Sequence, residues 1–187
     1  MQAIRGASFS AFAVALSVTA ACGTSSGLPA AIFENRVDTI SWYALDGTPL
    51  PAPSGYNVQS NQVVRTDRFT SFDFAFNITP TGQAVLSPTG ALGLGRSSGI
   101  QVQHTGFAAV TLAPTSAYVD TIAVPIDSGT VAVVHSRASS CSIGLVVFYY
   151  GKIQVLAIDP VARRIELQVL VDQNCGYRGL EPGIPRR

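Results

Sequence analysis

The chain has 187 residues, of which 47% are hydrophobic and only 12% are charged, and its formal net charge is +1. This composition is too apolar for an intrinsically disordered chain, and its near-neutral charge provides no field that would attract nucleic acid. The length fits one domain, and the 17 glycines and 11 prolines indicate a chain with many turns.

The first 21 residues have the pattern of an export signal. Arg5 supplies one positive charge, and the stretch Ala7–Ala21 that follows is apolar and rich in Ala, Phe, Val and Leu. A membrane-spanning helix needs about 20 apolar residues, so this stretch is too short for a permanent span. We expect residues 1–21 to form a signal helix that is removed on export.

The run Thr19-Ala20-Ala21-Cys22 ends this segment, and it resembles the lipobox of bacterial lipoproteins. The resemblance implies that Cys22 is lipidated and becomes the mature N-terminus. Thr19 departs from the aliphatic residue usual in that family, and ordinary cleavage near Ala21 is the alternative. A lipidated Cys22 would anchor the protein in one membrane leaflet. Gly23 follows in place of the Asp that resembles an inner-membrane retention signal, which favours the outer membrane; without lipid the protein would be secreted or periplasmic.

Residues 22–35 are predicted to be the lipidated N-terminus and a tether, and residues 36–187 an all-β domain. The first strand signal, Val37–Leu45, alternates apolar and polar residues and ends at the turn dipeptide Asp46-Gly47. The run Thr70–Ile78 alternates most regularly, and its large apolar residues would share one face of a strand. We assign this face to the core, with Asp73 on the wetter face.

Further strands are expected between Gly- and Pro-containing turns. Most are short, and the last two are long apolar runs joined by a turn at Pro160, which predicts a long hairpin. Together the strands predict a single antiparallel β-sandwich, with a small β-barrel as the alternative. The expected strands are Asn57–Thr66, Gln83–Leu86, Ile100–Gln103, Ala108–Leu112, Tyr118–Val124, Thr130–Ser136, Leu145–Ile158 and Ile165–Asp172.

Cys141 and Cys175 are the other two cysteines of the chain. An exported protein enters an oxidising compartment, where two remaining thiols usually pair. We therefore predict a Cys141–Cys175 disulfide rather than a redox or metal site, because neither a C-x-x-C spacing nor neighbouring histidines accompany them.

Two motifs overlap in one Gly/Ser-rich segment. Gly95–Gly99 has the letters of the G-x-S-x-G elbow with Ser97 as nucleophile, and Gly90–Ser97 resembles a phosphate loop in which Arg96 replaces the lysine. Both motifs require a helix after the loop, whereas an alternating strand is expected here. We interpret the segment as a loop between strands.

His104 and His135 are the two histidines of the chain, and its acidic residues are singly spaced. No calcium loop and no zinc motif is present, so we assign no metal ligands, no cofactor and no catalytic residues. The leading hypothesis is a non-catalytic envelope lipoprotein that binds an envelope protein or a glycan. The alternatives are a loop-assembled hydrolase using either histidine with an Asp, and a carbohydrate-binding or small-ligand-binding sandwich that exposes Trp42, Tyr56, Tyr149 or Tyr150.

Overall fold

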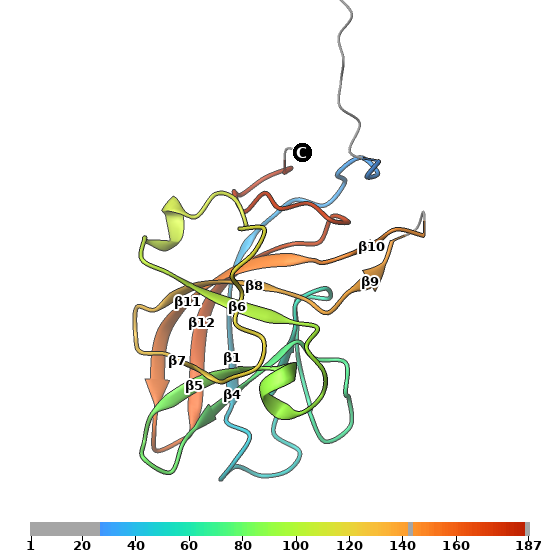
Figure 1. Cartoon of the computed structure of the whole chain (residues 1–187). Helices are drawn as coiled ribbons and strands as arrows, with labels where there is room; N and C mark the ends of the chain where they lie inside the picture. The colour runs from blue at the N-terminus through green and yellow to red at the C-terminus, as the bar shows by residue number, and fades with distance from the viewer. Residues whose placement is uncertain (1–26, 142–143, 186–187) are drawn as a thin grey trace, which may run out of the picture.

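The computed structural model describes residues 27–141 and 144–185, which form two five-stranded antiparallel sheets packed face to face (Figure 1). The predicted β-sandwich is confirmed. The barrel alternative is wrong, because the sheets do not close on each other. The first sheet has the order β1 (Val37–Tyr43), β12 (Arg164–Asp172), β11 (Tyr150–Asp159), β8 (Val131–His135) and β6 (Gly99–Gln103). The second has the order β3 (Gln62–Val64), β2 (Gly55–Asn57), β4 (Phe74–Ile78), β5 (Ala84–Pro88) and β7 (Val124–Pro125).

Three small elements complete the described structure. A two-stranded ribbon, β9 (Ser139–Ser140) with β10 (Val146–Val147), extends from the sandwich beside the first sheet (Figure 1). Two short 3-10 helices, η1 (Thr89–Leu92) and η2 (Phe107–Ala109), lie in the connections that precede and follow β6.

The core between the sheets follows the two-residue period of the strands. In β12, Ile165, Leu167 and Val169 point into the core, and residues of opposite character alternate with them. Across the core, the Trp42 ring stacks on the Tyr56 ring with centroids 5.6 Å apart. The period-two pattern therefore decides which face of each strand is buried.

Several predicted strands differ from the observed ones; Leu145–Ile158, for example, is divided between β10 and β11. The run Asn57–Thr66 is not one strand: it begins at the last residue of β2, passes through a turn and includes β3. Asn61 has the left-handed conformation at this turn. The run Ala108–Leu112 begins inside η2 instead of a strand. The run Tyr118–Val124 reaches a strand only at its last residue, in β7.

The outer face of the first sheet is partly covered as well. Loop residues 107–113 and Leu180 from the C-terminal segment lie over it and form a second apolar cluster with the sheet. The cluster contains Phe107, Val110, Ala113, Val131, Val133, Leu170 and Leu180. The sheet is thus buried on both faces near the C-terminal end of β12, which explains why the last four residues of β12 are all buried.

Lys152, the single lysine of the chain, is buried under this loop layer at 2% exposure. Its Nζ donates hydrogen bonds of 2.9 Å to the carbonyl oxygens of Phe107 and Val110, and it lies 4.5 Å from the centre of the Phe107 ring. Burial lowers the pKa of Lys152. The ammonium group therefore holds the loop layer against the sheet.

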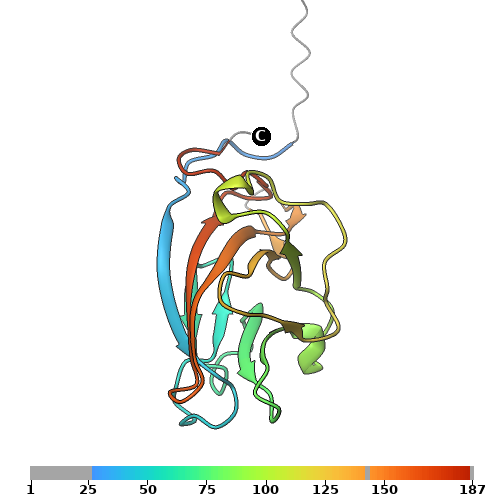
Figure 2. The same cartoon turned by 90° about the vertical axis from the view of Figure 1, so that its left-hand side faces the viewer.

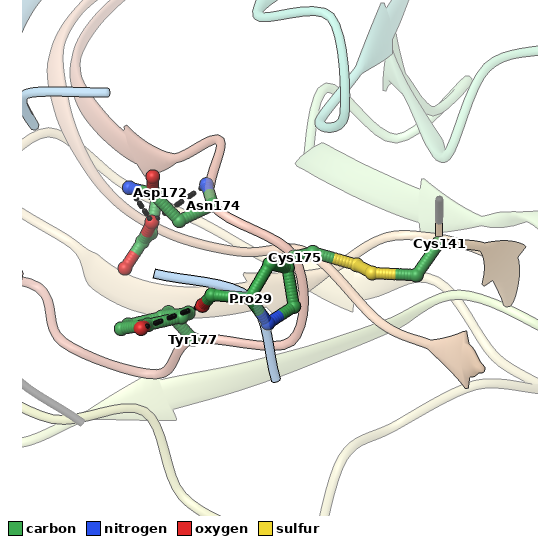
Figure 3. The surroundings of a disulfide bond; sticks show 6 residues. All are labelled: Pro29, Cys141, Asp172, Asn174, Cys175 and Tyr177. Atoms are coloured by element: carbon green, nitrogen blue, oxygen red, sulfur yellow. Dashed lines mark hydrogen bonds between the residues drawn. A yellow bond between two sulfur atoms is a disulfide. The ribbon is translucent and has the colours of Figure 1, made fainter. Parts of the chain in front are cut away.

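The disulfide predicted between Cys141 and Cys175 is confirmed, with a Cα–Cα distance of 6.1 Å (Figure 3). It joins the start of the β9–β10 connection to the segment that follows β12. Figure 3 shows Cys175 beside Pro29, close to where the described chain begins.

Residues 29–35 run along this end of the domain and are called the strap here. Asn174 holds its middle, because its Oδ1 accepts hydrogen bonds from the backbone of Ile32 (2.8 Å) and Phe33 (2.9 Å) and its Nδ2 donates to the Phe33 carbonyl (2.8 Å). Asp172 orients Asn174 by accepting from its backbone and side-chain nitrogens (Figure 3). Asp172 is fully buried, and burial raises its pKa.

Both ends of the strap are held too. At the start, the Tyr177 hydroxyl donates a 2.9 Å hydrogen bond to the Pro29 carbonyl (Figure 3). At the other end, Asn35 forms a β-bridge with Gly183, and its Nδ2 donates to the carbonyl oxygens of Gly179 and Glu181. The C-terminal segment therefore fixes the chain before β1 begins.

The predicted signal peptide, the lipobox residues and Cys22 lie outside the described residues. Within residues 27–141 and 144–185, no helix is long and apolar enough to cross a membrane.

Candidate functional site

A polar cleft of about 380 Å³ lies at one end of the sandwich, where both sheets contribute to its walls. It is formed after β2 and β8 end and before β4 and β6 begin. Its lining residues are polar with one exception, and they are Asn57, Gln59, Asp73, Ser97, Ser136, Arg137, Ala138 and Ser139.

Asp73 forms the floor of the polar cleft and is only 1% exposed. Its Oδ2 accepts a 2.7 Å hydrogen bond from the backbone of Val58, and its Oδ1 accepts from the backbone nitrogen (2.8 Å) and the Nε (3.2 Å) of Arg137. Burial raises the pKa of Asp73, and these hydrogen bonds and the Arg137 charge oppose the rise. The carboxylate therefore connects the two sheets and positions the guanidinium.

Arg137 provides the cation of the polar cleft. Besides Asp73, its Nη1 donates to the Thr70 carbonyl at 3.2 Å, and its side chain keeps 33% of its surface exposed. Its Nη2 has no hydrogen-bond partner among the described residues. A guanidinium fixed on one edge and open on the other is suited to binding a carboxylate or another anion.

The other lining residues fall into two groups. Ser136 and Asn57 are engaged by the protein: Ser136 donates to the Arg137 carbonyl and accepts from the backbone of Tyr149, and Asn57 donates to the Ser71 carbonyl. The side chains of Gln59, Ser97 and Ser139, by contrast, have no hydrogen-bond partner within the part of the chain that the structure describes. These three groups and Arg137 are thus available to a ligand.

His135 lies near the polar cleft but does not form a catalytic pair. Its Nδ1 donates to the Ser136 carbonyl at 2.8 Å, and its ring packs edge-on against Tyr118 and Phe148, with centroids 4.6 and 4.7 Å away. Burial lowers the pKa of His135. In residues 27–141 and 144–185 it has no hydrogen bond to a carboxylate, so the geometry expected of a hydrolase is not formed.

The other candidate catalytic and phosphate-binding residues from the sequence do not come together in one site. His104 is exposed just after β6. Ser97 and Arg96 lie in the loop between η1 and β6, and a strand rather than a helix follows them. Neither the nucleophile elbow nor the phosphate loop is therefore formed by this segment.

The four aromatic residues considered for carbohydrate binding do not form an exposed platform. Trp42, Tyr56 and Tyr149 are buried. Tyr150 is half-buried and packs against the second apolar cluster. An interaction based on stacking of sugar rings on these side chains is therefore not supported.

No metal centre is found in the described part of the chain, where no three His, Cys, Asp or Glu side chains lie close enough to hold an ion. Comparison with known protein families, characterised proteins and solved structures found no match for this chain. The polar cleft and the strap are therefore the structural features that bear on function.

Sequence reasoning missed Asp73 and Arg137 as a pair. The alternation in Thr70–Ile78 predicts Asp73 on the wetter face, and this prediction is wrong because Asp73 is buried. β4 begins only at Phe74, so the period does not extend to Asp73. Its partner is 64 residues away in sequence. The local signal was a charged residue directly before an apolar strand, and this signal does not identify a partner.

Proposed function

We propose that this chain is an exported envelope protein anchored by lipid on Cys22, and that it acts as a non-catalytic binding module. Its polar cleft binds a small hydroxylated ligand that carries a negative charge. The observation that carries this proposal is a set of polar groups in the cleft that make no hydrogen bond within the described structure: the side chains of Gln59, Ser97 and Ser139, and the Nη2 of Arg137, whose other nitrogens bind Asp73 and Thr70.

The chemistry of the cleft supports binding rather than turnover. Asp73 is closed off from solvent and already accepts three hydrogen bonds, so it is not positioned to remove a proton from a ligand. Ser97 has no histidine hydrogen-bonded to it among the described residues. Arg137 can pair with a carboxylate, and the amide and hydroxyls can bind hydroxyl groups.

The anchor is tested in cells by labelling with radioactive palmitate. The chain should incorporate label, and inhibition of lipoprotein signal peptidase by globomycin should cause the unprocessed form to accumulate. A Cys22→Ala variant should carry no label. Processing that continues in Cys22→Ala together with an unlabelled wild-type chain would show that the signal is an ordinary one.

The ligand class is tested by NMR titration with glucuronate, and with glucose as the uncharged control. Glucuronate should shift the amide resonances of Gln59 and Ser139, and Arg137→Gln should weaken binding about tenfold because it removes a charge-assisted hydrogen bond. Arg68→Gln, which changes an exposed arginine outside the cleft, should bind as the wild type does. Equal shifts with glucose and glucuronate would contradict the role of Arg137.

A further inference from the structure

The strap carries exposed apolar side chains. Ile32 is 73% exposed and Phe33 is 51% exposed, although their backbone is held firmly by Asn174. Gly176 lies between the ribbon and Leu28, the residue just before the strap: a Cβ built on Gly176 would be 3.0 Å from the Leu28 side chain and 3.1 Å from that of Val147. The neighbouring Val146 is 71% exposed. Ordered backbone thus presents these apolar groups to solvent.

The same end carries two more exposed apolar residues. Leu112 forms a β-bridge with Gly179, in the segment that binds Asn35 of the strap, and Ile184 lies next to that segment. Leu112 and Ile184 line a shared depression of about 510 Å³. We call this surface, with the strap and the β9–β10 ribbon, the strap end of the domain; it lies at the top of Figure 1 and Figure 2.

Exposed apolar residues are not confined to the strap end. Leu50 and Val161 are 76% and 93% exposed in turns at the opposite end, since they follow β1 and precede β12 respectively. Exposure alone therefore does not select a membrane-facing surface. The position of the proposed anchor distinguishes the strap end from the opposite end.

The length of chain between anchor and domain is short. Six residues separate Cys22 from Pro29, so seven Cα–Cα steps connect the two, and Tyr177 fixes Pro29 to the domain. Whatever path these residues follow, they span at most about 25 Å, because an extended chain advances about 3.5 Å per residue. A strand of nine residues such as β12 is about 30 Å long by comparison. With lipid on Cys22, Pro29 and the strap end around it stay within about 25 Å of the membrane, and the opposite end lies a further strand length along the domain from this tether.

We infer that the strap end rests on the membrane that holds the acyl chains of Cys22, with Ile32, Phe33 and Val146 contacting the lipid surface. This inference depends on the proposed lipidation of Cys22. Aromatic and aliphatic side chains at an interface add binding strength to a lipid anchor in proportion to their buried apolar area. The domain would therefore have one fixed orientation on the membrane.

The charges of the strap end agree with this orientation. Glu34 and Arg36 form an exposed ion pair within 3.2 Å of each other, and Arg178 and Glu181 contribute one charge of each sign. These four described charges sum to zero, so they favour neither an anionic nor a cationic lipid surface.

The orientation is tested with the full lipidated protein in phosphatidylcholine vesicles containing brominated acyl chains, which quench tryptophan fluorescence at short range. Phe33→Trp and Val146→Trp place the probe at the strap end, and Val161→Trp is the matched control at the opposite end. The natural Trp42 is 1% exposed and gives the same background in all three variants. Flotation of the vesicles measures anchoring separately.

The expected result is roughly twofold quenching and a blue shift of the added emission at positions 33 and 146, and no quenching at position 161. Quenching at all three positions, or at none of them while the protein floats with the vesicles, would overturn the inference and leave the anchor intact. A protein that does not float would overturn the proposed anchor itself, and the inference with it.

Discussion

Asn174 holds the strap, so its replacement by alanine should release the strap from the domain. The side chain makes four hydrogen bonds: three to the backbone of Ile32 and Phe33, and one of 2.8 Å to Asp172. At about 1 kcal/mol for each bond, and with some groups regaining water when the strap detaches, the expected loss is about 3 kcal/mol. Such a loss corresponds to roughly 100-fold in the equilibrium between attached and detached strap.

Hydrogen–deuterium exchange measures this equilibrium directly. The amide protons of Ile32 and Phe33, which both donate to Asn174, should exchange about 100-fold faster in Asn174→Ala than in the wild type. The urea midpoint should fall as well, because Asp172 loses a donor while it stays buried.

The neighbouring Gln173→Ala variant is the control. Gln173 makes one exposed hydrogen bond of 3.3 Å to the Gln59 carbonyl, so its loss should change stability by less than about 0.5 kcal/mol. Exchange at Ile32 and Phe33 in Asn174→Ala at the wild-type rate would refute the reasoning, because the strap would then be held by other contacts.

Three further predictions concern the disulfide, Asp73 and Lys152. Replacing Cys141 and Cys175 together by serine should lower the free energy of unfolding by about 4 kcal/mol, since the disulfide closes a loop across 34 residues; an unchanged urea midpoint would contradict this. Because burial raises the pKa of Asp73, its stabilising contribution is complete below the ordinary Asp pKa and is lost as pH rises through the folded-state pKa. Urea midpoints measured from about pH 3.5 to 6 should fall with rising pH, and less so in Asp73→Asn. Lys152 should react with an N-hydroxysuccinimide ester far more slowly in the native protein than in urea, as measured by peptide mass spectrometry; equal rates would mean that the loop layer is open.

Local alternation was sufficient to predict the sandwich but not its contacts. The hairpin of β11 and β12 lies where the two long apolar runs predict it, and Phe74 and Phe76 point into the core as the period requires. The prediction of a strand over Ala108–Leu112 failed because Val110, with the flanking Phe107 and Ala113, covers the outer face of the first sheet instead of joining the sheet. Period and propensity describe how one segment is buried, and they do not identify the surface that buries it.

The candidate site was harder to predict for the same reason. The polar cleft depends on Asp73 meeting Arg137, and the strap depends on Asn174 meeting Phe33; these pairs are 64 and 141 residues apart in sequence. The disulfide was predictable because the predicted export signal restricted the chemistry expected of two otherwise unassigned thiols. Nothing comparable restricts an asparagine or an aspartate, whose roles depend on neighbours that only the fold supplies.

The pairing of β1 has a consequence for biosynthesis. β1 belongs to the first third of the chain, yet its neighbour in the sheet is β12, the last strand, and the strap before it is bound by residues that follow β12. Neither segment can find its partner until nearly the whole polypeptide has emerged. Closing so long a loop is slow, so the sheet would be completed late. A chain built in this order completes its first sheet only after its C-terminal strand has been made.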